Sequence, residues 1–302
     1  MERMLMKVPR ILILGRIGQV GWELRHKLAC LGSVSSIDFP DIDFTKPESL
    51  REIVRSAQPS ILINAVAYTA VDKAETERDL AHAINATAPG VLAEEAKRIG
   101  ALLIHYSTDY VYNGSKESPW VETDSPNPLN VYGQTKLDGD LAIERVGGDY
   151  LILRTSWVYG ARGKNFLLTM LRLAKDRPEL RIVDDQKGSP TTSECIAQAT
   201  AQIITQVTAP GGGLAGRSGV YHFTNSGETT WYGFAREFLS RQANCPEIVP
   251  IPTSEYPVPA RRPANSVLSC AKLQEAFGVT MPSWELGLDL VLDTLEACAP
   301  QA

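Results

Sequence analysis

The sequence lacks several features that mark whole classes of protein. It carries no excess of positive charge, because 30 lysines and arginines face 35 aspartates and glutamates, which gives a formal net charge of −5. That balance argues against nucleic-acid binding, which usually needs a basic face. The five cysteines form no C-x-x-C pair, and the four histidines (His26, His82, His105 and His222) show no spacing typical of metal ligands. We therefore expect free thiols in a reducing cytoplasm and no catalysis by a metal.

Long hydrophobic runs are also missing. The apolar run within MERMLMKVPRILILGR is too short for the core of a signal peptide or for a membrane span, and no later run reaches membrane length. With 44% hydrophobic and 22% charged residues, the composition is that of a soluble globular protein with a sizeable core. These features predict a cytoplasmic protein with no membrane partner.

The first half of the chain contains a regular alternation of short apolar runs with helical patterns. Such alternation predicts an α/β fold, with a doubly wound parallel sheet. The expected strands are 10–15, 34–38, 60–67, 101–107 and 150–156. The expected helices are 19–32, 46–59, 77–100 with a break or kink at Pro89, and 132–146.

The first expected strand runs directly into a glycine-rich turn, GRIGQVG, in which Gly15, Gly18 and Gly21 lie three residues apart. A glycine turn between a strand and a helix lets the backbone approach a pyrophosphate, whose charge meets the helix N-terminus. Asp38, at the end of the second strand, could accept hydrogen bonds from the ribose of NAD. Arg16 could instead hold the phosphate of NADP, or it could be a solvated loop charge. The pattern predicts a Rossmann domain and leaves NADH and NADPH both open.

The alternation loosens after about residue 160. We expect helices near 164–176 and 192–206, a flexible loop at 208–219, and irregular, partly polyproline-like structure in the proline-rich segment 246–263. This organisation predicts two regions. Residues 1–160 would be mainly the dinucleotide-binding domain, and residues 161–302 mainly a smaller substrate-binding region with segments that return to the Rossmann core.

Candidate chemistry lies in the middle of the chain. The fourth expected strand ends in HYSTDYVYNG, so Ser107, Thr108 and Asp109 fall at the carboxyl edge of the sheet, where ligands bind in such folds. Tyr132 and Lys136 follow, four residues apart on one helical face. A nearby ammonium favours the phenolate and lowers the pKa of a tyrosine, which is about 10 when unperturbed. Together with the hydroxyl of Thr108, this arrangement predicts a general acid beside a hydride donor.

These motifs resemble a known family. GxxGxxG, STDYVY and YGQTK are typical of extended short-chain dehydrogenase/reductases. More narrowly, nine stretches from about Arg10 to about Trp284 are similar to dTDP-4-dehydrorhamnose reductases: GQVGWEL, NAVAYTAVDKAE, HYSTDYVY, NVYGQTKLDGD, LRTSWVYG, NFLLTMLRLAK, DDQKGSPT, TTWYGFA and PVPARRPANSVLS. The resemblance implies reduction of the 4-keto group of dTDP-4-dehydro-6-deoxy-L-mannose by NADPH or NADH.

The resemblance also implies roles for individual residues. The catalytic set would be Thr108, Tyr132 and Lys136, with Tyr132 giving the proton, Lys136 lowering its pKa and holding the nicotinamide ribose, and Thr108 adjusting the hydrogen bonding. The cofactor would contact Gly15, Arg16, Gly18, Gln19, Val20, Asp38, Asp43, Phe44, Ala67, Tyr68, Thr69, Tyr132 and Lys136. The dTDP-sugar would contact Val71, Thr108, Asp109, Tyr110, Tyr132 and Trp157, although Trp157 could also be a core tryptophan.

The chain departs from the family pattern in two places. Tyr68 stands where the family often has histidine, which could alter contacts near the nicotinamide. Some members form Mg²⁺-assisted homodimers through glutamates, and Glu23 and Glu194 match two such positions, but the tail LDTLEACAPQA matches poorly. The segment ARRP (260–263) could contact the diphosphate or could equally be a structural loop.

Two other functions stay open at this point. A sugar-nucleotide epimerase or dehydratase would share the fold and the Tyr-Lys pair but would recycle a bound cofactor. Dehydratases typically carry an acidic pair after the threonine, whereas here Asp109 is followed by Tyr110. A non-catalytic regulatory subunit, similar to the methionine adenosyltransferase beta subunit, would bind the dinucleotide while controlling a partner.

Overall fold

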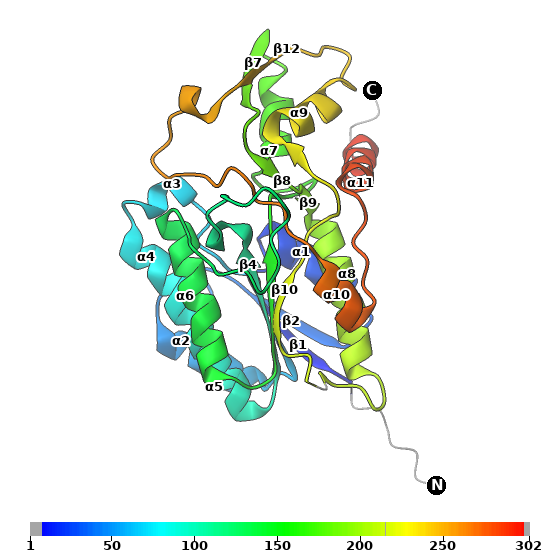
Figure 1. Cartoon of the computed structure of the whole chain (residues 1–302). Coiled ribbons are helices and arrows are strands. Elements are labelled where there is room, and N and C mark those ends of the chain that lie inside the picture. Colours follow the sequence, from blue (N-terminus) through cyan, green and yellow to red (C-terminus); the bar gives the residue numbers. More distant parts are fainter. Residues whose placement is uncertain (1–7, 215, 299–302) are drawn as a thin grey trace.

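The computed structural model describes residues 8–214 and 216–298 (Figure 1). Its centre is a six-stranded sheet in the order β10-β5-β4-β3-β1-β2, and every neighbouring pair is parallel. The strands are β1 Arg10–Leu14, β2 Ser33–Ile37, β3 Ile61–Asn64, β4 Leu102–Thr108, β5 Tyr150–Thr155 and β10 Gly219–His222. From β1 the chain goes to β2 on one side, and it then crosses from β2 to β3 on the other side of β1. The strand order therefore reverses beside β1. The expected doubly wound α/β fold is confirmed.

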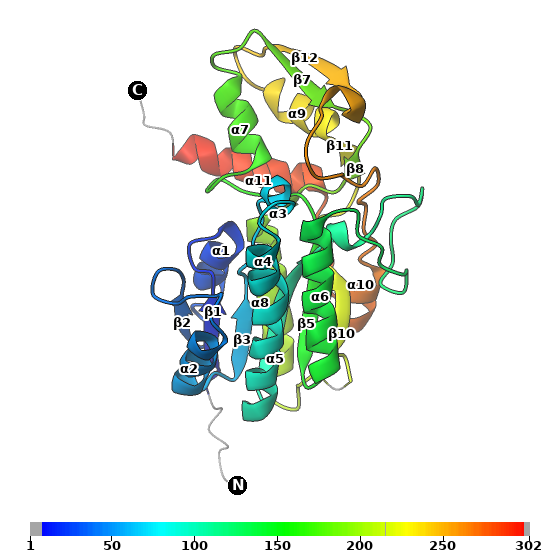
Figure 2. The ribbon, with the colours of Figure 1, turned by 90° about the vertical axis from the view of Figure 1, so that its left-hand side faces the viewer.

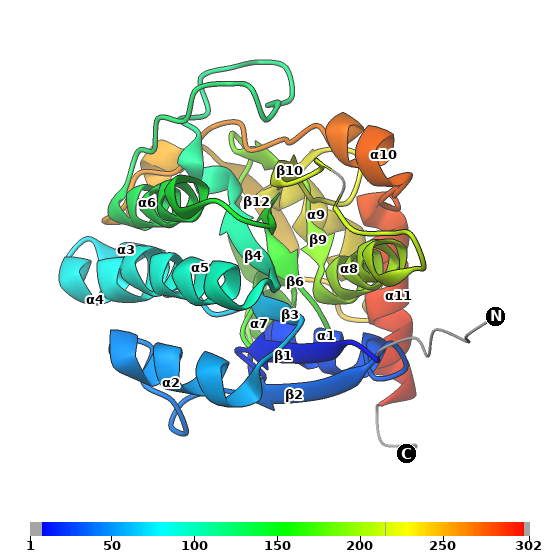
Figure 3. The same ribbon diagram turned by 90° about the horizontal axis from the view of Figure 1, so that it is seen from below.

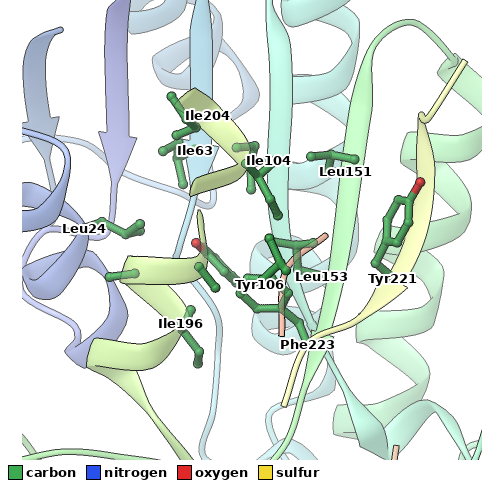
Figure 4. Packing of buried hydrophobic residues seen from close by; sticks show 14 of the residues in the cluster. Leu24, Ile63, Ile104, Tyr106, Leu151, Leu153, Ile196, Ile204, Tyr221 and Phe223 are labelled. Carbon is green, nitrogen blue, oxygen red and sulfur yellow. The ribbon is translucent and has the colours of Figure 1, made fainter. Parts of the chain in front are cut away.

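Helices cover both faces of this sheet (Figure 3). On one face lie α1 Gln19–Lys27, α8 Ser193–Thr208 and α10 Ala271–Phe277. On the other lie α2 Pro47–Ala57, α5 Ala88–Ile99 and α6 Val131–Val146, with α3 Val71–Ala74 and α4 Arg78–His82 beside them. Figure 4 shows Ile63, Ile104 and Leu153 of the sheet packed with Ile196 and Ile204 of α8. Because helices cover both faces, the inner strands β1, β3 and β5 are mostly apolar in both directions, which explains their continuous apolar runs, whereas the edge strand β2 (SVSSI) is only partly buried.

The expected helix 77–100 is divided by a π-helical segment, Ala83–Thr87. Pro89 then lies in the first turn of α5, directly after the π-helical segment. The irregularity that we expected at Pro89 therefore lies just before it.

A smaller layer lies above the carboxyl edge of the sheet (Figure 2). There β7 Glu179–Val183 pairs in parallel with β12 Glu247–Ile251. The helices of this layer are α7 Phe166–Leu173, α9 Trp231–Leu239 and α11 Trp284–Ala297. Their apolar faces form a separate core that includes Leu167, Phe234, Phe238 and Leu288. Short strand pairs complete it: β6 Val158–Tyr159 with β9 Thr191–Thr192, and β8 Lys187–Gly188 with β11 Thr229–Thr230.

Two expectations for the second half are corrected. The segment 246–263 is not irregular throughout, because residues 247–251 form β12, and Pro250 is accommodated beside Ile182 in a two-stranded sheet. The expected loop 208–219 ends by joining the central sheet, since Gly219 begins β10, which pairs with β5. The expected helices 164–176 and 192–206 are present as α7 and α8, with shifted ends.

Candidate functional site

Two of the three glycines of the first turn, Gly15 and Gly21, are required by close backbone contacts. Gly15 has φ +94°, and a Cβ there would lie 2.9 Å from the carbonyl oxygen of Ala65. A Cβ on Gly21 would lie 1.9 Å from the carbonyl oxygen of Gly15. Gly18 is the N-cap of α1, and no side chain caps this helix. The turn is therefore tight, and the N-terminal amides of α1 are left for a ligand with negative charge.

Asp38 holds this turn in place. Its two carboxylate oxygens accept hydrogen bonds from the backbone amides of Ile17 and Phe39, each at 2.8 Å. Arg16 forms an ion pair with Asp41 at 2.6 Å, and about a third of the arginine side chain stays exposed (35%). Asp38 and Arg16, the two candidates for contact with the adenosine ribose, thus both lie at the glycine turn.

The remaining cofactor candidates surround the turn. Asp43 accepts hydrogen bonds from Thr45, which lower the pKa of its carboxyl. After β3, the amide side chain of Asn85 fixes the backbone of Tyr68, accepting from its N–H at 2.8 Å and donating to its carbonyl at 3.1 Å. The hydroxyl of Tyr68 donates to Glu77, and this hydrogen bond raises the pKa of the phenol to about 12. Phe44 is buried, Val20 and Ala67 are half-buried, and Thr69 is exposed.

Gln19 extends from α1 toward the smaller layer. Its side-chain oxygen accepts a hydrogen bond of 2.8 Å from Asn165 at the start of α7. The turn that we expect to hold the cofactor is thereby joined to the other half of the protein.

The end of β4 presents Thr108 and Asp109. The Thr108 hydroxyl donates to the Asp109 carboxylate at 3.0 Å and accepts from the backbone amide of Tyr110 at 3.2 Å. Burial raises the pKa of Asp109 to about 7. The hydroxyl of Thr108 is thus fixed in orientation at the carboxyl edge of the sheet.

Helix α6 brings Tyr132 and Lys136 to the same edge. Asn130 caps the helix by accepting from the amide of Gly133 at 2.8 Å. A Cβ on Gly133 would lie 2.2 Å from the carbonyl oxygen of Tyr110, so glycine permits the helix to approach the end of β4. The rings of Tyr110 and Tyr132 meet edge to face with centroids 5.6 Å apart. The structure therefore brings the three expected catalytic residues together.

The electrostatics of Tyr132 differ from the expectation. Burial raises the pKa of Tyr132 to about 12, while hydrogen bonding with Thr108 acts in the opposite direction. The amine of Lys136 points behind the site, where it donates to the carbonyl oxygen of Tyr106 at 2.7 Å and lies 3.1 Å from Nε2 of His105. Burial lowers the pKa of Lys136 to about 8. The lowering of the Tyr132 pKa by Lys136 is not seen in this arrangement.

A cavity of about 540 Å³ extends from Tyr110 into the smaller layer. Its wall includes two arginines, Arg181 and Arg262, and the indole of Trp231. Trp157 lies behind that indole, because the two rings stack with centroids 3.6 Å apart. The cavity is lined by Asp72, Tyr110, Lys164, Asn165, Phe166, Thr169, Met170, Arg181, Ile182, Val183, Gln186, Trp231, Tyr256, Val258 and Arg262.

Of the expected substrate residues, only Tyr110 lines this cavity. Trp157 supports it through Trp231, and Val71 begins α3 next to Asp72 of the wall. Arg262, from the ARRP segment, forms an ion pair of 2.9 Å with Asp72. Sequence reasoning did not single out Trp231, Arg181 or Tyr256; the aromatic pair in TTWYGFA was the one available signal for Trp231.

Glu23 and Glu194 lie near one another on α1 and α8. Burial and the charge of Glu194 raise the pKa of Glu23, and Lys27 donates to Glu194 at 2.6 Å. The Glu194 carboxylate is thus paired with an ammonium, and a Mg²⁺ role for these two glutamates stays a prediction. Among the residues that the structure describes, no group of three or more histidine, cysteine, aspartate or glutamate side chains is placed to hold a metal ion.

Two further findings bear on the sequence expectations. All five cysteines are free thiols. Within residues 8–214 and 216–298, no helix combines the length and the apolar character that crossing a membrane requires.

Comparison with known proteins places this geometry in a family. Residues 9–297 match the family model described as the RmlD substrate binding domain. A dTDP-4-dehydrorhamnose reductase of Burkholderia thailandensis is 49% identical over 95% of this chain and 99% of its own length, and one of Escherichia coli K12 is 46% identical over 94% and 97%. The crystal structure of a dTDP-4-dehydrorhamnose reductase from Bacillus anthracis in complex with NADP superposes with a TM-score of 0.89 at 34% identity, covering 95% of this chain and all of that one. The chain belongs to the dTDP-4-dehydrorhamnose reductase family.

Proposed function

We propose that the protein reduces the 4-keto group of dTDP-4-dehydro-6-deoxy-L-mannose (dTDP-4-dehydrorhamnose) to dTDP-L-rhamnose with NADPH or NADH. This is the last step of dTDP-rhamnose biosynthesis, which supplies a precursor of cell-surface polysaccharide. The observation that carries the proposal is the position of Thr108 and Tyr132 beside Tyr110, which lines the cavity, with Lys136 one turn along α6 from Tyr132.

The described residues fit a nicotinamide dinucleotide. The N-terminus of α1 lacks a side-chain cap, and the turn before it has no Cβ at Gly15 or Gly18. The diphosphate would lie against these amides, with Asp38 and Arg16 near the adenosine ribose and Lys136 near the nicotinamide ribose. When bound, the reduced nicotinamide supplies the hydride.

Tyr132 is the proposed proton donor to the substrate oxygen. Its phenol keeps its proton at neutral pH, since burial raises the pKa of Tyr132 to about 12. The side chain of Thr108 hydrogen-bonds with Tyr132. Tyr110, Val71 and Asp109 would orient the sugar, while Trp157 acts through the indole of Trp231.

The choice between NADPH and NADH is part of this proposal. The guanidinium of Arg16, which is partly exposed and paired with Asp41, and the NADP bound to the relative from Bacillus anthracis support NADPH. Asp38 is already engaged by the backbone of the turn, which reduces its freedom to meet a ribose hydroxyl. We expect NADPH to give the higher kcat/KM.

An absorbance assay at the nicotinamide band, with dTDP-4-dehydrorhamnose and each reduced cofactor in turn, tests the function. A reductase consumes one cofactor for each sugar reduced. Turnover of the sugar without net oxidation of the cofactor would instead identify an epimerase or dehydratase. Cofactor binding without any turnover would favour the regulatory subunit.

The division of labour within the chain and its cellular setting are also proposals. The glycine turn at Gly15–Gly21 supports a dinucleotide-binding role for residues 1–160, and the cavity wall supports a substrate-binding role for residues 161–302. We further propose a cytoplasmic protein, where nicotinamide cofactors and nucleotide sugars are available, and a homodimer that size-exclusion chromatography with light scattering would detect.

A further inference from the structure

A buried chain of polar side chains lies behind the proposed site. It runs from Asn64 at the end of β3, through His105 in β4, to Lys136 on α6, and these side chains are 2%, 0% and 1% exposed. Nδ2 of Asn64 lies 3.0 Å from Nδ1 of His105, and Nε2 of His105 lies 3.1 Å from Nζ of Lys136. Because these side chains are buried, each of these contacts needs one donor and one acceptor.

The orientation of the Asn64 amide is fixed by the backbone. Its side-chain oxygen accepts the amide hydrogen of Val66 at 3.1 Å. A turned amide would place its NH₂ group against that N–H, leaving two donors face to face. The NH₂ group of Asn64 must therefore be the side that meets His105.

This orientation determines the tautomer of His105. Burial lowers the pKa of His105 well below its usual value, so the imidazole is neutral. A neutral imidazole has one donor nitrogen and one acceptor nitrogen. Nδ1 accepts from Asn64, and hence the hydrogen is on Nε2 and points at Lys136.

Nζ of Lys136 must then accept a hydrogen bond. An ammonium has three donors and no acceptor, whereas a neutral amine has a lone pair. The contact with Tyr106 is compatible with an amine as well, because the carbonyl oxygen of Tyr106 accepts one of its N–H groups at 2.7 Å.

The charges around Lys136 permit this state. Asp140, one turn further along α6, would favour the ammonium, but its carboxylate is held by Arg154 of β5 at 3.1 Å. Tyr132, one turn earlier, keeps its proton. Burial is the first cause of the lowered pKa of Lys136.

We propose that Asn64 and His105 are positioning residues that favour the neutral amine of Lys136 in the ligand-free protein. Charging Lys136 requires the hydrogen of His105 to move to Nδ1 and the amide of Asn64 to turn, so three groups change together. The consequence for the reaction rests on the proposed function: an ammonium that would stabilise the Tyr132 phenolate forms only after this switch.

The first test reads the two protonation states directly by NMR on the ligand-free protein. Long-range ¹H–¹⁵N correlations of the imidazoles, recorded at about pH 9 with His105→Gln to assign the signal, should show hydrogen on Nε2 of His105. The ¹³Cε resonance of Lys136, assigned by its loss in Lys136→Met, should titrate near pH 8. Hydrogen on Nδ1 at about pH 9, or a lysine that stays charged to about pH 10 as a free side chain does, would overturn the proposal.

The second test removes the fixed donor. In Asn64→Ala the imidazole can turn its acceptor toward Lys136, so the titration midpoint of the lysine should rise by about one pH unit or more. Asn64→Asp, which keeps the acceptor for Val66, should raise it as well and covers the case in which the alanine variant does not fold. The matched control is Asn225→Ala, because Asn225 is also buried, accepts from the amide of Thr192 and donates to the carbonyl of Pro282.

An unchanged midpoint in folded Asn64 variants would reject the role of Asn64. Both tests use the ligand-free protein and no substrate. A protein without reductase turnover would therefore contradict the proposed function, while the His105 tautomer and the Lys136 titration midpoint could still be measured and interpreted.

Discussion

At the scale of single residues, burial keeps the phenol of Tyr132 protonated, and that suits a reduction. A proton donor must retain its proton until the carbonyl oxygen has become basic through hydride transfer. The pKa of Tyr132 of about 12 secures this at neutral pH. A site tuned for oxidation of an alcohol would need the opposite, a phenolate ready to accept the proton.

Tyr132→Phe should therefore abolish most turnover while leaving cofactor affinity nearly intact. Loss of a general acid lowers kcat by roughly 10²–10⁴-fold, and the ring still fills the space beside Tyr110. Turnover by the absorbance assay and cofactor affinity by fluorescence titration check both parts. Tyr150→Phe, a half-buried tyrosine at the start of β5, is the control and should keep its activity. Unchanged turnover in Tyr132→Phe would rule out this acid.

The site residues that sequence reasoning could identify are those with a local motif. Tyr132 and Lys136 share one helical face and Thr108 ends a strand, and the resemblance to the family assigned all three to one site. Trp231 and Arg181 have no such spacing. They reach the cavity because α9 and β7 pack together in the smaller layer, and Trp231 then stacks on Trp157. Long-range packing of this kind is not encoded in a short pattern.

At the scale of elements, the glycines of the turn between β1 and α1 have separate tasks. Gly21 allows α1 to approach the turn, since a Cβ there would lie 1.9 Å from the carbonyl oxygen of Gly15. A Cβ on Gly18 would meet that oxygen at 3.5 Å, an ordinary contact. Gly18 is therefore dispensable for the fold, and its role is close approach to a ligand.

Alanine substitutions at Gly21 and Gly18 should separate the packing of α1 from the binding of the cofactor. Gly21→Ala should lose about 1–3 kcal/mol of unfolding free energy because the helix must shift. Gly18→Ala should unfold like the parent protein and yet bind the cofactor more weakly. Urea denaturation and cofactor titration measure the two effects. Equal destabilisation by both substitutions would contradict the assignment.

Glu95 joins α5 to α2. Its buried carboxylate contacts Arg55 at 2.6 Å, Arg98 at 2.8 Å and Arg51 at 3.3 Å. These arginines, Arg55 first, lower the pKa of Glu95 to about 2. Since this value lies below the ordinary 4.5, the carboxylate adds stability above pH 4.5, and that stability is lost as the pH falls toward about 2.

Glu95→Gln should lower the unfolding free energy at pH 7 by about 1–3 kcal/mol, because hydrogen bonds to charged groups are lost. The difference from the parent protein should shrink as the pH falls below 4.5. Urea denaturation at several pH values measures it. Glu94→Gln, an exposed neighbour that meets only Arg51, is the control and should have a small effect. A difference that does not depend on pH would show that the charge is not responsible.

Elements were predictable where burial on both faces made the pattern continuous. The run RILIL gives β1, and similar apolar runs that are buried on both faces give β3 and β5. Strand β10 has four residues next to a glycine-rich segment, and β12 contains Pro250, so neither has a continuous signal. Pro250 is tolerated because β12 pairs on one side only, with β7.

At the scale of the whole molecule, the glycine turn and the cavity are joined by one side chain. Asn165 caps α7 with its oxygen, which accepts from Leu168 at 2.9 Å, and its NH₂ group donates to Gln19 of α1 at 2.8 Å. Asn165 also lines the cavity. The alternation of strands and helices predicted the doubly wound sheet, but a contact between residues 146 positions apart could not be read from it.

This contact should couple the two ligands. A ligand that orders Gln19 also places Asn165, so we expect dTDP to tighten NADPH binding by about fivefold or more, within the usual range of coupling between sites. Asn165→Asp keeps the acceptor that caps α7 but removes the donor to Gln19, together with the donors to the carbonyls of Gly160 and Arg162, and the coupling should fall toward none. Titration of NADPH with and without saturating dTDP measures it, and the reverse titration must give the same factor. Thr169→Val, which loses a hydrogen bond to the Asn165 carbonyl but leaves Gln19 in place, should keep the coupling. If Asn165→Asp couples its ligands as the parent does, communication between the turn and the cavity takes another route.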